Sequence, residues 1–181
     1  MSSMALAVIS FPVTITIAVA WWVLVRRRRS EHLRKRFVPE YDRMINKHYN
    51  QRCAEAVLDT REKRVQHLQI RLLTQEDHDH FAKDWQADQT RFVDDPEGAV
   101  TEADRLITEL MKTRGYPVSD FKQRVADISV DHPHFVVNYR AAAEIAQRHR
   151  GGQATTEDLR QAMLYYRKLF DDLLETAQTT K

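Results

Sequence analysis

The chain has 181 residues, of which 43% are hydrophobic and 30% are charged, and its formal net charge is +2. Seven basic residues and one acid, Glu31, lie within residues 26–36, so the rest of the chain is mildly acidic. Nucleic-acid binding needs cations clustered on a folded surface, so this balance excludes nucleic acid as a partner. Cys53 is the only cysteine, which excludes an intramolecular disulfide. No redox or nucleophile motif surrounds it.

An uncharged and mostly apolar run covers residues 4–25 and is followed directly by a block of arginines. As a helix rising about 1.5 Å per residue, these 22 residues reach roughly 33 Å, enough to cross a hydrocarbon core of about 30 Å. Two tryptophans near its end suit the aromatic belt of a membrane interface. The sequence therefore predicts a single N-terminal transmembrane helix. Its predicted membrane-interface residues are Trp21, Trp22, Arg26, Arg27, Arg28 and Arg29.

The basic residues predict how this helix is oriented. Basic residues favour the cytoplasmic side, so the N-terminus is expected outside and everything after residue 25 in the cytoplasm. The predicted location is the cell (inner) membrane, with anionic lipid headgroups as partners of the basic collar. A cleaved signal peptide is an alternative, because Ala18-Val19-Ala20 offers a cleavage site. No basic residue precedes the apolar run, which favours an uncleaved anchor over a signal peptide. A buried helix of a soluble protein is disfavoured because such helices are rarely this long without a charge.

The rest of the chain is predicted to be helical almost throughout, because only four glycines occur and apolar residues recur at spacings of three and four. Residues 30–73 carry a long polar stretch with an interrupted apolar stripe, which predicts a helical stalk and connector through which the chain could form a homodimer. Residues 74–181 predict a compact bundle of about five helices. The predicted protein is all-α, with an anchor and basic collar at residues 1–29, the stalk at 30–73 and the bundle at 74–181.

Residues that favour helix ends divide the bundle. Thr74 is placed to cap a helix, and Asp95 is placed to cap the next one, which has Pro96 at its first position. Gly115 is expected to end that helix. Gly151, with the glycine after it, is expected to end a later one. These signals fix the expected boundaries without indicating a function.

Two histidine-containing clusters are candidate metal sites. His78 and His80 point about 200° apart on a helix, whereas helical zinc pairs need spacings of three or four residues. Asp131, His132 and His134 lie at a turn that could gather ligands, but no second ligand cluster accompanies them. A helix cap explains the same residues. The sequence therefore predicts no metal site.

Arg114 lies in an Arg-Gly-Tyr-Pro turn whose parts could bind an anion. A helix end with a favourably placed cation explains the turn equally well. The chain contains no P-loop, dinucleotide fingerprint, nucleophile elbow or His-Glu-x-x-His motif. We therefore predict no catalytic residues and no cofactor.

Several longer motifs become specific when they are taken together: Phe37-Val38-Pro39-Glu40-Tyr41-Asp42-Arg43, Phe92-Val93-Asp94-Asp95-Pro96, Arg114-Gly115-Tyr116-Pro117, Ser129-Val130-Asp131-His132-Pro133 and Thr156-Glu157-Asp158-Leu159-Arg160. Through them, residues 36–175 resemble a family of uncharacterised bacterial proteins. The resemblance implies a helical protein, often preceded by an apolar N-terminal segment. It implies no activity, cofactor or catalytic residue, and His78 and His80 do not belong to the shared pattern.

We expect a protein-interaction or scaffold module at the cytoplasmic membrane, because the sequence combines an anchor with an acidic helical domain and contains no catalytic motif. The alternative is a membrane-tethered enzyme or ligand-binding domain, with its site near Asp131, His132 and Arg114 and with Tyr139 beside them. A third possibility is a lipid-sensing or purely structural anchor.

Overall fold

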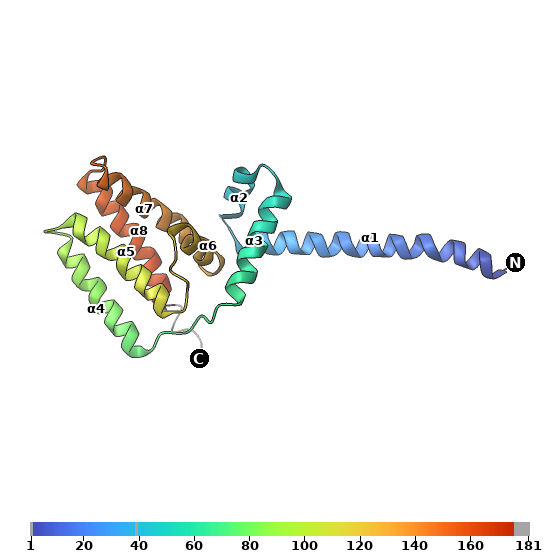
Figure 1. Cartoon of the computed structure of the whole chain (residues 1–181), viewed down its shortest axis with the longest axis horizontal. Coiled ribbons are helices and arrows are strands. Elements are labelled where there is room, and N and C mark those ends of the chain that lie inside the picture. The colour runs from blue at the N-terminus through green and yellow to red at the C-terminus, as the bar shows by residue number, and fades with distance from the viewer. Residues whose placement is uncertain (1, 39, 176–181) are drawn as a thin grey trace. The chain divides into compact units, whose positions relative to one another are not determined.

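A computed structural model of the chain describes residues 2–38 and 40–175, with side chains for residue 17 and from residue 19 onward within those ranges. The described residues form eight helices and no strand, which confirms the predicted all-α class. Packing divides the chain into two units, Met1–Arg36 and Phe37–Lys181. The helices, labelled in Figure 1, are α1 (Ser2–Arg36), α2 (Glu40–His48), α3 (Gln51–Gln66), α4 (Gln75–Arg91), α5 (Pro96–Thr113), α6 (Phe121–Asp131), α7 (Val136–Arg150) and α8 (Thr156–Glu175).

The first unit is the single helix α1, which contains the predicted membrane span. Within the described part of the chain, no helix combines the length and the apolar character that a membrane crossing requires. The side chains of residues 4–16, the first part of the predicted span, lie outside the described ones. The predicted single-pass inner-membrane location, with the N-terminus outside and the rest cytoplasmic, is therefore corrected.

The second unit begins with a helical hairpin of α2 and α3. Asn50 caps α3 by accepting a hydrogen bond from the backbone of Arg52 at 2.8 Å. Tyr49, just before it, has a positive φ of 50°, a backbone conformation that suits the tight turn between the two helices. These helices cover much of the segment predicted as a stalk, and α3 packs against α6.

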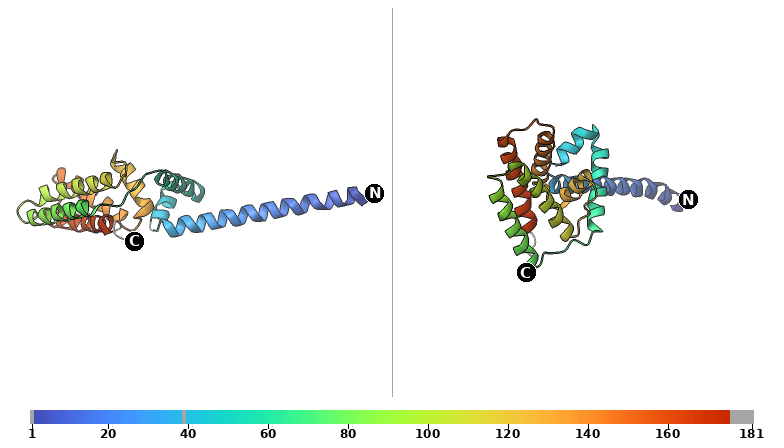
Figure 2. Two further views of the ribbon diagram at one scale, coloured as in Figure 1. Left: turned by 90° about the horizontal axis from the view of Figure 1, so that it is seen from below. Right: turned by 60° about the vertical axis from the view of Figure 1, so that its left-hand side comes forward.

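The remaining five helices form a bundle in which α8 packs against both α5 and α7, and α4 packs against α5 (Figures 1 and 2). Its core is apolar and continuous, because α5 and α8 each bury seven or more residues along one face. Trp85 of α4 stacks on Phe170 of α8 with ring centroids 4.4 Å apart. Tyr139 of α7 meets Tyr166 of α8 edge-on. Aromatic contacts thus join α8 to both α4 and α7.

Local signals set the ends of these helices, as the sequence predicts. The hydroxyl of Thr74 accepts from the backbone of Asp77, and the Asp77 carboxylate accepts in return from the backbone of Thr74, which forms a capping box. Asp95 caps α5 by accepting from Gly98 at 2.8 Å, with Pro96 in the first turn. Such caps satisfy amides that have no partner within the helix.

The turn after α5 depends on Gly115. Its φ is +93°, and a Cβ there would lie 2.5 Å from the carbonyl oxygen of Gln69. The connector before α4 therefore runs directly against this turn, where the amide of Arg71 donates to the carbonyl of Arg114 at 2.9 Å. Only glycine allows both the conformation and the close approach.

Candidate functional site

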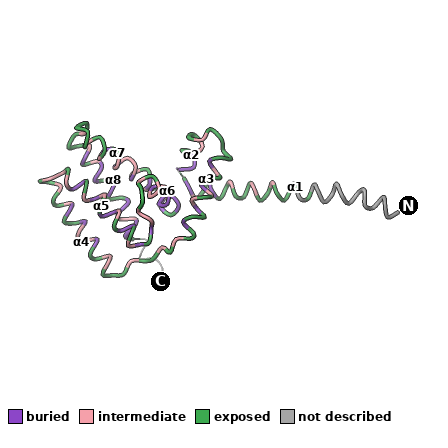
Figure 3. Tube along the Cα trace, in the orientation of Figure 1, coloured by how far each residue is buried: buried purple, intermediate pink, exposed green. Residues whose placement is uncertain are grey.

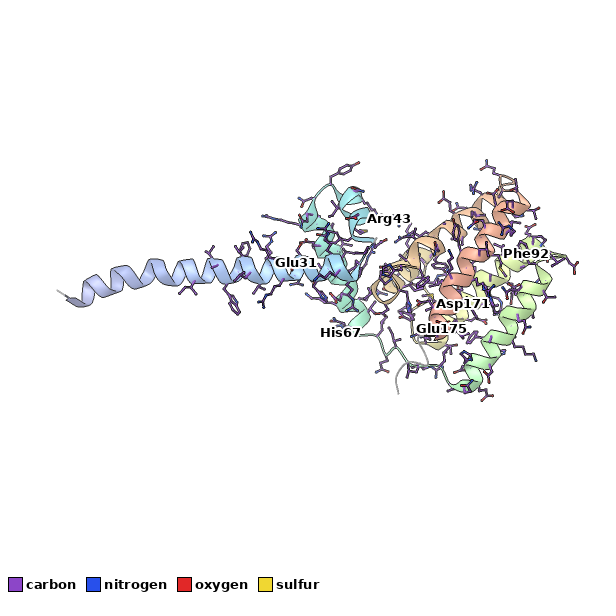
Figure 4. All side chains as sticks on the ribbon, turned by 180° about the vertical axis from the view of Figure 1, so that it is seen from behind. Glu31, Arg43, His67, Phe92, Asp171 and Glu175 are labelled. Carbon is purple, nitrogen blue, oxygen red and sulfur yellow. The ribbon has the colours of Figure 1, made fainter. Side chains whose placement is uncertain are left out.

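The sequence-predicted site near His132 forms a buried polar cluster at the end of α6. His132 is 3% exposed, and its Nδ1 contacts the Asp172 carboxylate of α8. Tyr116 donates to the carboxylate of Asp131 at 2.8 Å. In Figure 4 the labelled Asp171 and Glu175 mark the part of α8 where Asp172 lies. The cluster therefore ties the end of α6 to α8 and to the turn after α5.

Arg114 lies at the same end of the bundle. It is 4% exposed, and its Nη1 donates to the carbonyl of Leu173 at 2.9 Å, one residue beyond the partner of His132. Tyr139 is not part of this cluster, because its hydroxyl donates to Asp104 of α5 at 3.2 Å. Arg114 and His132 thus contact neighbouring residues of α8, and Tyr139 lies elsewhere. These hydrogen bonds hold helices together.

The other histidine pair, His78 and His80, lies on α4. His78 contacts its neighbour Asp79 at 3.2 Å, and His80 contacts Asp84 at 3.6 Å, one turn further along α4. The two rings therefore have separate partners. The described residues contain no group of three or more potential metal ligands. Cys53 is exposed on α3.

A buried ion cluster that the sequence did not indicate joins α2 to the bundle. Glu40 is 1% exposed, and Arg140 of α7 donates to both of its oxygens at 2.6 and 2.7 Å. Arg61 of α3 donates to it at 3.1 Å and to the hydroxyl of Ser129 on α6 at 3.3 Å. Burial alone raises the pKa of Glu40, but Arg140 and then Arg61 outweigh it and lower the pKa below 4.5.

Asp88 of α4 is a second buried carboxylate, and its pKa is shifted in the opposite direction from that of Glu40. It is 3% exposed, and neither of its oxygens has a hydrogen-bond partner among the described residues. Burial, and then the nearby charge of Glu102, raises the pKa of Asp88 to about 7, although Arg91 and Arg105 act in the opposite direction. Asp88 therefore gains or loses its proton close to neutral pH.

A cavity of about 360 Å³ lies among α5, α6, α7 and α8, which are seen together in Figure 2. Its walls carry charges of both signs, including Asp104, Arg124 and Arg140, beside apolar surface from Phe121 and Tyr166. Sequence reasoning missed it, because its residues come from four helices and share no local motif. The one available signal was Tyr139, whose hydroxyl bonds to Asp104 on the cavity wall.

The predicted membrane-interface residues lie on α1, in a part that Figure 3 colours largely as exposed. Trp21 is 69% exposed and Trp22 is 58% exposed. The Arg26 guanidinium lies 5.2 Å from the centre of the Trp22 ring, a cation–π contact. Arg27, Arg28 and Arg29 are exposed. Their predicted contact with lipid depended on the span corrected above.

Comparison of the chain with protein-family models, with curated proteins and with solved structures gave no match. No relative therefore assigns a role to the cavity, the Glu40 cluster or the exposed part of α1.

Proposed function

We propose that this protein is a helical protein-interaction module that docks to its partner through α1. The observation that supports the proposal is a group of large apolar side chains in the described part of α1, each between 48% and 69% exposed. They are Ile17, Val19, Trp21, Trp22, Leu24 and Val25. Soluble proteins rarely leave so much contiguous apolar surface uncovered unless it binds something.

The spacing of these residues indicates how a partner would bind. Ile17, Trp21, Leu24 and Val25 follow the i, i+4, i+7, i+8 pattern that places side chains on one face of a helix. Amphipathic helices that bind in apolar grooves use anchors at such spacings. Burying each large side chain contributes about 1.5–3 kcal/mol, so a few anchors suffice for a specific complex. We define these four residues as the α1 stripe.

The arginines that follow the stripe favour one kind of partner. Arg28 continues the same face, and Arg27 lies beside it, so the groove that receives the stripe would carry acidic residues at its far end. A second copy packed in parallel would instead bring the same arginines together, and like charges disfavour that pairing. The proposed partner is therefore a different protein with an apolar, acid-rimmed groove. A homodimer through residues 30–73 stays a prediction.

Position-specific photo-crosslinking in the native cells tests this proposal. A photoreactive residue at Leu24 is expected to give one protein adduct of defined mass, whereas the same residue at Val93, which is 82% exposed on the second unit, is expected to give none. Replacing Arg27 and Arg28 by glutamate should remove the adduct. Equal adducts at both positions, an adduct with a second copy, or no protein adduct at position 24 would contradict the proposal.

The alternative function at Asp131, His132 and Arg114 stays a prediction. Each of these side chains has a partner within the bundle, respectively Tyr116, Asp172 and Leu173. A helix-joining role accounts for these contacts, and we do not propose a reaction there.

A further inference from the structure

The cavity among α5, α6, α7 and α8 contains an arginine with unused hydrogen-bond donors. Arg124 of α6 donates through Nη1 to the hydroxyl of Thr108 on α5. Its Nε is buried and has no hydrogen-bond partner among the described residues, and no acceptor there holds its Nη2. Buried donors are almost always satisfied, so this guanidinium edge indicates a missing acceptor. A carboxylate matches two adjacent guanidinium N–H groups well.

A carboxylate with an unused oxygen lies close to this arginine. Asp104 accepts from the Tyr139 hydroxyl through Oδ1 at 3.2 Å, and no donor among the described residues holds its Oδ2. The Thr108 hydroxyl, which accepts from Arg124, itself donates to the backbone carbonyl of Asp104 at 2.8 Å. Asp104 and Thr108 are one helical turn apart on α5, so the carboxylate of Asp104 and the guanidinium of Arg124, which bonds to Thr108, both line the cavity.

The other charged groups in the cavity wall are largely occupied. Arg140 donates both terminal nitrogens to Glu40. His149 contacts Glu97 at 3.1 Å through Nε2. Glu144 and Arg150, both exposed, add one charge of each sign to the lining. The lining has no net excess of either sign. Arg124 and Asp104 are oppositely charged groups linked by contacts through the Thr108 hydroxyl, while Nδ1 of His149 is also buried without a partner among the described residues.

Apart from Thr101 and Gln147, the rest of the lining is apolar or aromatic. Phe121 packs against Tyr139 with ring centroids 5.2 Å apart and also carries the Arg124 guanidinium at 5.8 Å. Leu159 and Val100 are buried at the wall. The cavity, at about 360 Å³, lies at the lower end of the roughly 300–1,000 Å³ range of small-molecule sites. It suits a small ligand with one apolar group.

We propose that this cavity binds a small amino-acid-like zwitterion with an apolar side chain. The ligand carboxylate binds Arg124, its ammonium group binds Asp104, and its side chain packs against Phe121, Tyr166 and Leu159. The Tyr139 hydroxyl stays protonated and keeps donating to Asp104, because burial and then the charge of Asp104 raise the pKa of Tyr139. The proposal goes beyond the docking of α1, because it uses a different unit of the chain and none of the same residues.

Calorimetric titration of the full chain with three matched compounds tests the site. L-Phenylalanine carries both charges, 3-phenylpropanoate lacks the ammonium group, and phenethylamine lacks the carboxylate. We expect L-phenylalanine to bind at least about tenfold more tightly than either of the others, because each lost ion pair removes a charge-assisted hydrogen bond. Equal binding of all three, or binding of phenethylamine alone, would overturn the proposal. Absence of binding by L-phenylalanine and by every other apolar amino acid would also overturn it.

Two substitutions locate the binding on these residues. Arg124→Gln removes the positive group, and Asp104→Asn removes the negative charge while it keeps an oxygen for the Tyr139 hydroxyl. Each is expected to weaken L-phenylalanine binding by about tenfold or more. Arg160→Gln, on the exposed side of α8 where Arg160 pairs with Glu157, is the matched control and should leave binding unchanged. Thermal unfolding of each variant checks that it is folded. Folded Arg124→Gln protein that binds as tightly as the wild type would contradict the assignment.

Discussion

Two arginines in the wall of the same cavity have opposite roles. Arg140 donates to both oxygens of the buried Glu40, whereas Arg124 donates to one hydroxyl and leaves its Nε buried without a partner among the described residues. Arg140 therefore connects α7 to α2, and its donors are unavailable to a ligand. The two arginines thus differ in how many of their donors the fold already uses.

The largest expected effect on stability comes from breaking the buried ion pair between Arg140 and Glu40. Replacing Arg140 by glutamine leaves Glu40 with Arg61 as its nearest cation, so we expect the free energy of unfolding at pH 7 to fall by about 3 kcal/mol. Denaturant unfolding followed by circular dichroism measures the change. The paired variant Arg140→Gln with Glu40→Gln should recover part of the loss, because no buried charge is left without its main partner.

The contribution of Glu40 to the free energy of unfolding should depend on pH in a defined direction. The pKa of Glu40 is lower in the folded protein than its ordinary value of 4.5, so its stabilising contribution is present above pH 4.5. That contribution disappears as the pH falls through the folded pKa. Wild type and Glu40→Gln should therefore converge in stability at low pH. A constant difference between them down to pH 2 would contradict the ion-pair explanation.

Asp88 shows what burial does to a carboxylate that has no arginine bonded to it. Its pKa rises from 3.8 to about 7, so the unfolded chain loses this proton at lower pH than the folded one. Stability should then fall as the pH rises from about 4 to about 7 and stay level above that range. Asp88→Asn removes this loss, and we expect it to stabilise the protein by about 2 kcal/mol at pH 8 and hardly at all at pH 4.

Thermal melts of the wild type and Asp88→Asn across this pH range provide the measurement. A gain that is equal at both ends of the range would mean that the substitution acts through packing and not through the proton. A loss at pH 8 would mean that the ionised carboxylate has a partner in solution.

The smallest expected effect on stability is that of the second cavity arginine. Arg124→Gln loses one hydrogen bond to Thr108 and the contact with Phe121, so we expect a decrease of only about 1 kcal/mol. Arg140→Gln should cost clearly more in the same denaturant series. Equal losses of stability in the two variants would contradict the view that Arg140 stabilises the fold whereas Arg124 is free to bind a ligand.

The sequence predicted those parts of the structure that short-range chemistry decides. The caps at Thr74 and Asp95 and the turn at Gly115 depend on residues a few positions away, and the structure confirms them. The bond between Glu40 and Arg140 joins residues 100 positions apart, and no spacing in the sequence indicates it. The bond between Arg124 and Thr108 likewise forms only after α5 and α6 have packed.

The membrane prediction was wrong for a related reason. It counted apolar residues along one segment, and no helix in the described part of the chain is both long and apolar enough to cross a membrane. The apolar side chains of α1 are nevertheless exposed, and Trp21 and Leu24 are each more than half exposed. That exposure supports the proposed docking role of α1 and is tested separately from the cavity.

The difference between the two cavity arginines can be tested most directly by observing both in one sample. Side-chain Nε–Hε signals of Arg124 and Arg140 would be followed by NMR while L-phenylalanine is added to the full chain. We predict that the Arg124 signal shifts and saturates as its donors gain an acceptor, and that the Arg140 signal stays in place. An Arg124 signal that does not move, or an Arg140 signal that moves as much, would contradict the account.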